Sequence, residues 1–407
     1  YYQEVSNMNN IRKLTDSLFW VGVNDRRIAL FENVYPVPTG MSYNSYVLLD
    51  EKTALFDTVD ASFTHDFLEN VTAALNGRTL DYLIVNHMEP DHCASIADVI
   101  AAYPEAKIVC TAKAVGMMKQ FFDLDVDSRA IPVKEGDTVS LGSHELTFVM
   151  APMVHWPEVM VTYEKTEKIL FSADAFGSFG AVDGNIFADE IDDKVAWLSE
   201  ARRYYTNIVG KFGMSVQGLL KKAAGLEIRM ICPLHSVIWR EDLPWLIDKY
   251  LKWSSYTPEE KSVTIAYGSV YGHTEKAADI LAGKLADRGI RHISVFDVSK
   301  THPSYIIADA FRTSAIVFAS ITYNGGIFCN MDTLLHQLAA HGLTNRTAAL
   351  IQNGTWAATT SKQMGEILGT MKNIHVLESD VTIKSALKDN QEAELDALAD
   401  AIAASLQ

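Results

Sequence analysis

Cysteine is scarce in this sequence, and no two cysteines stand at the spacing of a metal-binding pair. The 407 residues include four of them, at Cys93, Cys110, Cys232 and Cys329. A disulfide framework, an iron–sulfur cluster and a four-cysteine zinc site are therefore poorly supported. We expect a reducing compartment, and hence a cytoplasmic location.

An excess of positive charge and long apolar runs are lacking as well. Lys and Arg number 35 against 51 Asp and Glu, which gives a formal net charge of −16. Such a chain repels phosphates, so we expect no binding to nucleic acid or to anionic lipid. No apolar run reaches the ~18 residues of a membrane span, and the first residues do not resemble a secretory signal. Hydrophobic residues make up 48% of the chain, which predicts a globular protein of two or three domains.

The pattern of predicted elements changes after residue 250. Before it, short strand patterns alternate with turns and a few helices, which predicts a mixed layered domain. A stretch of Ser, Thr, Pro and charged residues at 252–261 is the expected linker, and we place the domains at 1–256 and 262–407. The expected strands are 45–49, 53–57, 82–85, 107–110, 145–150, 160–163, 169–172 and 228–232, and the expected helices are 64–75, 94–102, 112–122 and 192–208.

Strand and helix patterns alternate strictly in the second half of the chain. This alternation of short buried strands with crossover helices predicts a doubly wound parallel sheet. The expected strands are 262–267, 293–296, 315–319, 348–351 and 374–377, and the expected helices are 274–287, 332–341, 361–370 and 392–405.

Residues of metal-ligand type stand at or just past the ends of apolar strands in the first half. The segment His87-Met88-Glu89-Pro90-Asp91-His92 follows one apolar run, and His155, Asp174 and His235 each follow a later one. Strands packed in one sheet bring their ends to a common edge, so these side chains can converge. The histidines with polar neighbours are expected at the surface, namely His65, His144, His292 and His302.

The candidate ligands are His87, Glu89, Asp91, His92, His155, Asp174 and His235. Seven ligands are too many for one tetrahedral zinc ion, but they suit two ions that share a bridging carboxylate. Four imidazoles and three carboxylates without thiolate suit iron, manganese or zinc, and the donor set alone does not choose among them.

Here the chain resembles the flavodiiron proteins, whose first domain has the metallo-β-lactamase-like fold, an αββα sandwich. In that family Glu replaces the second His of the zinc hydrolases' His-x-His-x-Asp-His, as Glu89 does here. The segments 42–46, 151–157 and 172–177 resemble the family too. The resemblance implies one iron on His87, Glu89 and His155, a second on Asp91, His92 and His235, and Asp174 as the bridge. All of these except His92 are also implied to be catalytic, because the equivalent of His92 swings away from the iron in some members.

Other residues near these strand ends carry weaker expectations. Asp57, which ends an apolar run, resembles the second-shell aspartate of the fold, although a simple turn aspartate explains it equally well. Four aromatic residues could line a pocket for a small gas, although aromatic side chains at such positions are more often core; they are Phe31, Trp156, Tyr204 and Tyr205.

Three strand ends in the second half predict a flavin site. The first carries Ser269, Val270, Tyr271, Gly272, His273 and Thr274, the second Ser320, Thr322, Tyr323, Asn324 and Gly325, and the third Asn353, Gly354, Thr355 and Trp356. A strand, a hydroxyl-rich loop and a helix N-terminus form a cradle for phosphate, and neutral donors are typical of an FMN site. Ligands of an open parallel sheet bind at such strand ends. These loops also resemble those of flavodoxin-type FMN domains.

The resemblance implies a gas-reducing oxidoreductase with two iron ions and FMN. An external donor such as rubredoxin would reduce FMN, and the iron pair would reduce O2 to water, NO to N2O, or both. It also implies a head-to-tail homodimer or a dimer of dimers. Two alternatives are a zinc-dependent hydrolase of the metallo-β-lactamase fold with an accessory flavodoxin-like domain, and a flavoprotein electron carrier without enzymatic activity.

Overall fold

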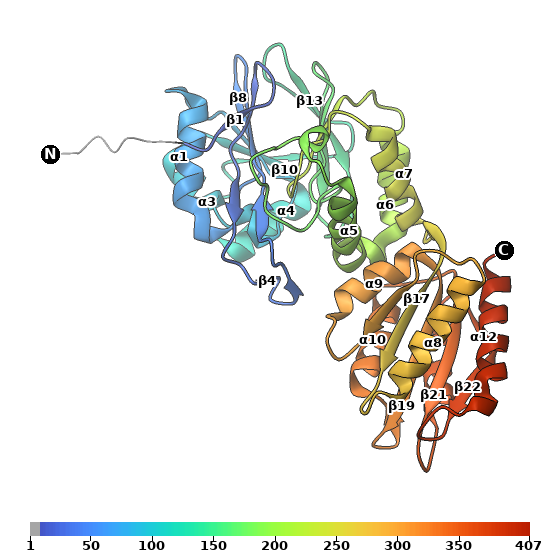
Figure 1. Ribbon diagram of the computed structural model, residues 1–407. Helices are drawn as coiled ribbons and strands as arrows, with labels where there is room; N and C mark the ends of the chain where they lie inside the picture. The colour runs from blue at the N-terminus through green and yellow to red at the C-terminus, as the bar shows by residue number, and fades with distance from the viewer. Residues whose placement is uncertain (1–8) are drawn as a thin grey trace. The chain divides into compact units, whose positions relative to one another are not determined.

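The computed structural model describes residues 9–407, which form two compact units (Figure 1). The first unit extends to Tyr204 and resumes over Met214–Tyr250. The second comprises Tyr205–Gly213 and Leu251–Gln407. The chain therefore leaves the first unit briefly at Tyr205 before it returns and completes that unit.

The first unit contains two mixed sheets. One has the strand order β1-β2-β7-β8-β9-β10-β11, and the other β12-β13-β14-β15-β16. The first sheet consists of β1 (Arg12–Lys13), β2 (Leu18–Trp20), β7 (Tyr46–Leu49), β8 (Thr53–Phe56), β9 (Tyr82–Ile84), β10 (Lys107–Thr111) and β11 (Ala130–Val133). The second consists of β12 (Thr138–Ser140), β13 (Glu145–Met150), β14 (Met160–Glu164), β15 (Ile169–Phe171) and β16 (Met230–Cys232). Two small antiparallel pairs join β3 (Val23–Asp25) to β6 (Met41–Tyr43) and β4 (Leu30–Phe31) to β5 (Tyr35–Pro36).

Helices cover the outer faces of the two sheets, which gives the αββα sandwich predicted from the resemblance (Figure 1). On the side of the first sheet lie α1 (Thr64–Leu75), α3 (Ile96–Ala102) and α4 (Ala112–Phe121), and α2 (Pro90–Cys93) is a single turn after β9. On the side of the second sheet lie α5 (Lys194–Tyr204), α6 (Gly213–Ala223) and α7 (Leu243–Ser254). Short helical turns occur at Ala61–Phe63, Ala188–Glu190, Tyr205–Val209 and Gly210–Phe212.

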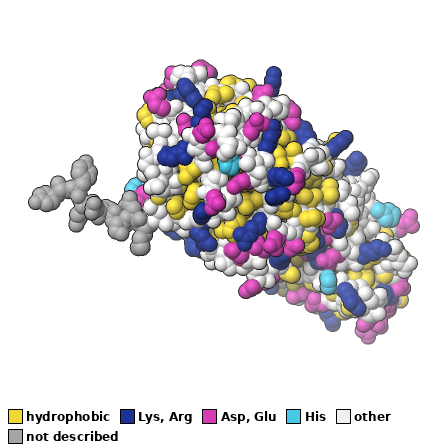
Figure 2. All heavy atoms as spheres, turned by 90° about the horizontal axis from the view of Figure 1, so that it is seen from above, with side chains coloured by type: hydrophobic (Ala, Val, Ile, Leu, Met, Phe, Trp, Pro, Cys, Tyr) yellow, Lys and Arg dark blue, Asp and Glu magenta, His cyan; other side chains and the backbone are white. Residues whose placement is uncertain are grey.

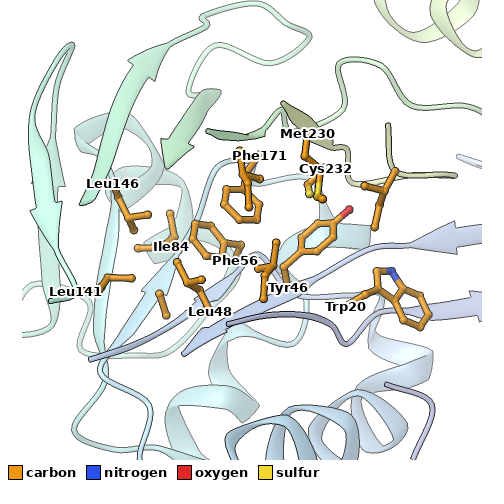
Figure 3. Close-up of a cluster of buried hydrophobic side chains, with 14 of the residues drawn as sticks. Trp20, Tyr46, Leu48, Phe56, Ile84, Leu141, Leu146, Phe171, Met230 and Cys232 are labelled. Atoms are coloured by element: carbon orange, nitrogen blue, oxygen red, sulfur yellow. The ribbon is translucent and has the colours of Figure 1, made fainter. Parts of the chain in front are cut away.

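The inner faces of the two sheets form one hydrophobic core (Figure 3). Phe56 of the first sheet stacks on Phe171 of the second, with ring centroids 3.7 Å apart and planes 9° from parallel. Tyr46 meets the same Phe171 ring edge-on at 5.5 Å. Both β8 and β15 end beside these rings, so the core fixes how the ends of the two sheets face each other.

The second unit is built on a parallel sheet with the order β18-β17-β19-β21-β22, in which every one of these pairs is parallel. This is the flavodoxin-like order, with β17 as the first strand. Its strands are β17 (Glu260–Gly268), β18 (Ser294–Asp297), β19 (Thr313–Tyr323), β21 (Arg346–Asn353) and β22 (Ile374–Ile383), and β20 (Gly326–Ile327) pairs with the end of β19.

Helices cover both faces of this sheet. One face packs on α8 (His273–Asp287) and α12 (Glu392–Ser405), and the other on α9 (Pro303–Arg312), α10 (Cys329–Ala340) and α11 (Thr360–Leu368). A short turn at Asp389–Gln391 precedes α12. Central strands buried on both faces explain why their sequences read as continuous apolar runs.

The surface mixes charges of both signs. Figure 2 shows acidic and basic side chains interspersed with apolar ones on the face seen from above, so the net negative charge is not gathered into one patch there. Within residues 9–407, no helix is both long enough and apolar enough to cross a membrane.

Several local predictions differ from the structure. The expected linker is largely ordered, because α7 continues to Ser254 and Arg346 donates to the carbonyl oxygen of Tyr256 at 2.7 Å. His144 is buried rather than exposed, with Nδ1 3.1 Å from Glu164 Oε1. The antiparallel pairing of β13 with β14 places these two side chains together, and polar neighbours in the sequence do not reveal that pairing.

Candidate metal centre and flavin cradle

Seven buried side chains of the first unit converge in two groups. The first comprises His87, Glu89, His155 and Asp174, and the second Asp91, His92 and His235. Within each group the candidate ligand atoms all lie within 4.8 Å of one another. The structure thus brings together every residue that the sequence singles out as a candidate ligand.

Asp174 lies between the two groups and faces each with a different oxygen. Its Oδ2 is 3.2 Å from His155 Nε2 and 3.7 Å from His87 Nε2. Its Oδ1 is 3.2 Å from His92 Nε2 and 3.9 Å from His235 Nε2. A carboxylate in this position can bridge two ions, one in each group.

Both sheets contribute residues to this centre. His87 and Glu89 follow β9, Asp91 and His92 lie in α2, His155 lies between β13 and β14, Asp174 follows β15, and His235 follows β16. Pro90 is the first residue of α2, where its fixed φ suits the helix and its missing N–H has no cost. Because α2 starts there, the chain turns directly after Glu89 and brings Asp91 to the second group.

The donor set fits a pair of cations. Among the described residues, both carboxylate oxygens of Asp91 and Oδ1 of Asp174 are buried without a hydrogen-bond partner. The Nε2 atoms of His92 and His235 lie 3.0 Å apart. Buried carboxylate oxygens without donors are costly, and cations between these atoms would remove that cost. A shell of imidazole and carboxylate without thiolate suits iron.

The opposed carboxylates and imidazoles shift each other's pKa. Burial opposes protonation of His155, but Asp174 and Glu89 outweigh it and raise its pKa to about 9. Burial also opposes protonation of His87, yet Asp174 leads the carboxylates that raise its pKa well above the usual range. Burial opposes ionisation of Asp174, but His87 and His92 hold its pKa well below the ordinary value. The pocket therefore favours positive charge between its carboxylates.

Neighbouring groups hold the segments that carry the ligands. Asp57 Oδ1 accepts hydrogen bonds from the backbone N–H groups of Asn86 and His87 at 2.7 and 3.2 Å. Burial raises the pKa of Asp57 to about 6. His235 Nδ1 lies 2.7 Å from the carbonyl oxygen of Ser42, which can only accept, so His235 presents its Nε2 lone pair to the second group.

Three of the four aromatic residues considered for a gas pocket contact candidate ligands. The rings of Phe31 and Tyr204 lie 5.6 and 5.4 Å from that of His235. The ring of Trp156 lies 5.4 Å from that of His87. Tyr205 belongs to the second unit and does not take part. The contacting rings place apolar surface beside the candidate ligands.

In the second unit, a cavity of about 290 Å³ lies at the carboxyl ends of the sheet strands. Its lining comprises Ser269, Tyr271, His273, Thr274, Ile321, Asn353, Thr355 and Ser385. Gly272 immediately precedes α8 with φ +85°, a value that favours glycine, so the chain can turn sharply from the first loop into the helix. The first amides of α8 and the hydroxyl groups beside them suit a phosphate.

The cavity also has an acceptor that fits a ribityl hydroxyl group. Asn353 Oδ1 is buried and has no hydrogen-bond partner within residues 9–407, whereas its Nδ2 donates to Thr274 Oγ1 at 3.3 Å and to Ser385 O at 3.1 Å. Neutral donors for a phosphate beside an unsatisfied acceptor for a hydroxyl group fit FMN.

The second predicted loop reaches this cavity through Ile321. Ser320, Thr322, Tyr323, Asn324 and Gly325 lie at the end of β19 and in the turn to β20, outside the lining. Tyr323 is 48% exposed and Trp356 is 94% exposed, so both rings remain available to a flat aromatic ligand.

Comparisons with known proteins agree with both sites. Residues 41–236 match the model of the ODP family beta lactamase. The anaerobic nitric oxide reductase flavorubredoxin of Aeromonas hydrophila is 31% identical over 84% of this chain and 69% of its own length. The chain belongs to the flavodiiron protein family.

Solved structures of flavodiiron proteins share the complete fold. The rubredoxin oxygen:oxidoreductase of Desulfovibrio gigas superposes with a TM-score of 0.90 at 29% identity, covering 97% of this chain and 98% of its own. The flavodiiron protein of Giardia intestinalis gives a TM-score of 0.92 at 25% identity and covers 98% of each chain.

Two acidic residues beside the metal centre of this flavodiiron protein are not evident from the sequence. Glu158 lies 2.8 Å from the Nδ1 atom of His87, and the only signal is a charge within the apolar segment 151–161. Glu32 lies in the turn between β4 and β5 with φ +50°. Partial desolvation of the carboxyl group and the nearby Glu89 raise the pKa of Glu32 above its usual value, although the residue as a whole is exposed.

Metal binding to the stripped flavodiiron protein should release protons at pH 7. His155, with a pKa near 9, and His87 are protonated in stripped protein, and an ion must displace those protons to reach Nε2. Affinity should therefore rise with pH up to and beyond the pKa of His155 near 9. Calorimetric titration with Fe(II) in two buffers of different ionisation enthalpy measures the release. A heat independent of the buffer at pH 7 would contradict the expectation.

Proposed function

We propose that the protein is an oxidoreductase that reduces O2 to water, NO to N2O, or both, at a non-haem diiron site. Electrons would reach this site through FMN from an external donor such as rubredoxin. The observation that carries the proposal is Asp174, whose two oxygens face two separate groups of ligands. The relatives named after nitric oxide reduction and oxygen reduction support both substrates.

The proposed ligand sets follow the two groups. His87, Glu89 and His155 would hold one iron, Asp91, His92 and His235 the other, and Asp174 would bridge them. Bound iron and FMN would supply the electrons and the open positions for the gas. Glu89, Asp91 and Asp174 would balance the positive charge, because no thiolate is present to do so.

Protons are the second requirement of both reactions. Reduction of O2 to two waters consumes four electrons and four protons, and coupling of two NO to N2O and water consumes two of each. Desolvation and the nearby Glu89 raise the pKa of Glu32, and the rings of Phe31 and Tyr204 lie against the ring of His235. These residues suit a pocket where proton supply is local.

The proposed FMN domain covers residues 262–407, and the proposed diiron domain covers 1–256. The cavity between Ser269 and Ser385 would bind the phosphate and ribityl chain, and Tyr323 and Trp356 would flank the ring system. Because the two sites belong to different units, we further propose a head-to-tail homodimer in which FMN of one chain serves the iron pair of its partner. Sedimentation velocity combined with activity at decreasing protein concentration tests this arrangement.

A cytoplasmic location is part of the same proposal. All four cysteines are free, and Cys93, Cys110 and Cys232 are buried. Free thiols are typical of proteins in a reducing compartment.

Replacing His155 by Ala should abolish gas consumption while flavin reduction continues. His155 Nε2 faces Glu89 and Asp174 in the first unit, whereas the FMN cavity belongs to the second. Gas electrodes for O2 and NO, together with bleaching of the flavin absorbance by reduced rubredoxin, measure the two steps. His65→Ala is the control, since His65 is exposed on α1. Undiminished turnover of His155→Ala would refute the assigned site.

Metal and flavin content separate this proposal from the alternatives. A zinc hydrolase would purify colourless with zinc only, and an electron carrier would contain flavin without reducing either gas. Family membership and the presence of both donor sets argue against these two alternatives.

A further inference from the structure

Glu158 is a buried carboxylate directly behind one candidate ligand. It is 2% exposed and precedes β14, and its Oε1 lies 2.8 Å from His87 Nδ1. The same oxygen accepts a hydrogen bond from the backbone N–H of Met88 at 2.9 Å. Its own carbonyl oxygen accepts from Thr111 Oγ1 at 3.0 Å, which fixes the segment that carries it.

This contact fixes the tautomer of His87. An ionised carboxylate can only accept, so Nδ1 carries the hydrogen, and in the neutral imidazole that a bound ion requires Nε2 keeps its lone pair. That lone pair points toward the first group, since Nε2 lies 3.3 Å from Glu89 Oε2 and 3.7 Å from Asp174 Oδ2. Glu158 therefore orients His87 for a cation on its other side.

The charge of Glu158 has no other local partner. Its Oε2 atom is buried without a hydrogen bond, and in residues 9–407 its ion pair is with His87. A buried carboxylate without a compensating cation is costly. A cation bound at His87 Nε2 compensates the charge through the imidazole ring, so ion and carboxylate stabilise each other.

Among the described residues, no carboxylate is hydrogen-bonded to the Nδ1 atom of either histidine of the second group. His235 Nδ1 faces the neutral backbone carbonyl of Ser42 at 2.7 Å. His92 Nδ1 is buried and has no hydrogen-bond partner among the described residues. A carboxylate acceptor makes an imidazole a more basic ligand than a carbonyl acceptor does. The histidine His87 of the first group therefore has a negative charge behind it, whereas His235 of the second group has a neutral carbonyl group, although the ligand types of the two groups are similar.

We propose that Glu158 is a positioning residue that makes the two iron positions inequivalent, so that the iron on His87 is bound more tightly and is harder to reduce. This inference rests on the proposed diiron function. It assigns Glu158 no contact with the gas and no part in proton transfer. Its effect is confined to one ion of the pair.

The test compares Glu158→Gln and Glu158→Ala with the wild-type holoenzyme. Gln keeps an acceptor for Nδ1 but removes the charge, and Ala removes both. Glu158→Ala should lower the affinity for one of the two ions by about 10- to 100-fold, as loss of an outer-shell partner does. Glu158→Gln should lower that affinity less. Competitive Fe(II) titration gives the affinities, Mössbauer spectra resolve the two irons, and redox titration gives their potentials.

The control is Glu164→Gln, which removes a buried carboxylate beside a histidine that is not a candidate ligand. Glu164 Oε1 lies 3.1 Å from His144 Nδ1, outside both ligand groups, so iron binding should stay unchanged. The inference predicts that one Mössbauer doublet and one potential change in Glu158→Gln, with the potential moving upward. An equal loss of affinity for both ions, or unchanged affinity for both, would overturn the role proposed for Glu158 while leaving the diiron function intact. A wild-type protein that binds no iron pair would overturn both.

Discussion

Replacing Asp174 by Ala is expected to remove both ions of the pair. Asp174 is fully buried, and its two oxygens face imidazoles of both groups at 3.2 Å. Loss of an outer-shell partner alone costs about 10- to 100-fold in metal affinity, so loss of the shared carboxylate should cost at least ~100-fold for each ion. Iron content after gel filtration and Fe(II) titration of stripped protein measure the effect, and gas reduction should be lost with the metal.

Asp125→Ala is the matched control for this change. Asp125 is an exposed aspartate of the same unit that bonds only to its own turn, so iron content should equal that of the wild type. If Asp174→Ala loses one ion and keeps the other at full affinity, the bridge is not shared. Retention of both ions would contradict the ligand assignment altogether.

Replacing Gly354 by Ala should weaken FMN binding and leave the iron pair in place. A Cβ atom on Gly354 would collide with the carbonyl group of Ala357, so the loop that follows Asn353 must move. Overpacking of this kind typically costs about 1–3 kcal/mol. If this energy destabilises the loop in its FMN-bound conformation but not in the FMN-free protein, FMN affinity drops by about 5- to 150-fold. Flavin absorbance after dialysis and iron content of the same sample measure the two sites.

Gly365→Ala provides the comparison. Gly365 lies in α11, and a Cβ atom there meets nothing within 4 Å. This variant should keep its flavin and gain some stability, because Ala is a better helix former than Gly by about 1 kcal/mol. Wild-type flavin affinity in Gly354→Ala would mean that this loop takes no part in binding.

The convergence of the seven candidate ligands could be predicted because the segments that carry them follow apolar strands. His155, Asp174 and His235 stand directly after apolar segments, and parallel or paired strands bring such ends together. The α1 and α12 helices were predicted with the bounds that the structure gives, Thr64–Leu75 and Glu392–Ser405. In these segments the local pattern and the tertiary environment agree.

Other features depend on partners that are distant in sequence. The residues next to Glu158 and His144 in the sequence do not reveal their partners, which are His87 and Glu164. These contacts form only when segments distant in sequence come together. The small pairs β3–β6 and β4–β5 consist of two or three residues a strand, too few to give an alternating pattern. Helix α5 was expected to continue to residue 208, but the chain enters a wider helical turn at Tyr205–Val209.

The origin of the ligands in both sheets has a consequence for assembly. Since β9 belongs to one sheet and β15 and β16 to the other, each bound ion would link the two sheets at one end of the sandwich. Stability then depends on the free iron concentration, and an ion present at one hundred times its Kd adds about 2.7 kcal/mol. A cell short of iron would therefore lose folded enzyme as well as loaded enzyme.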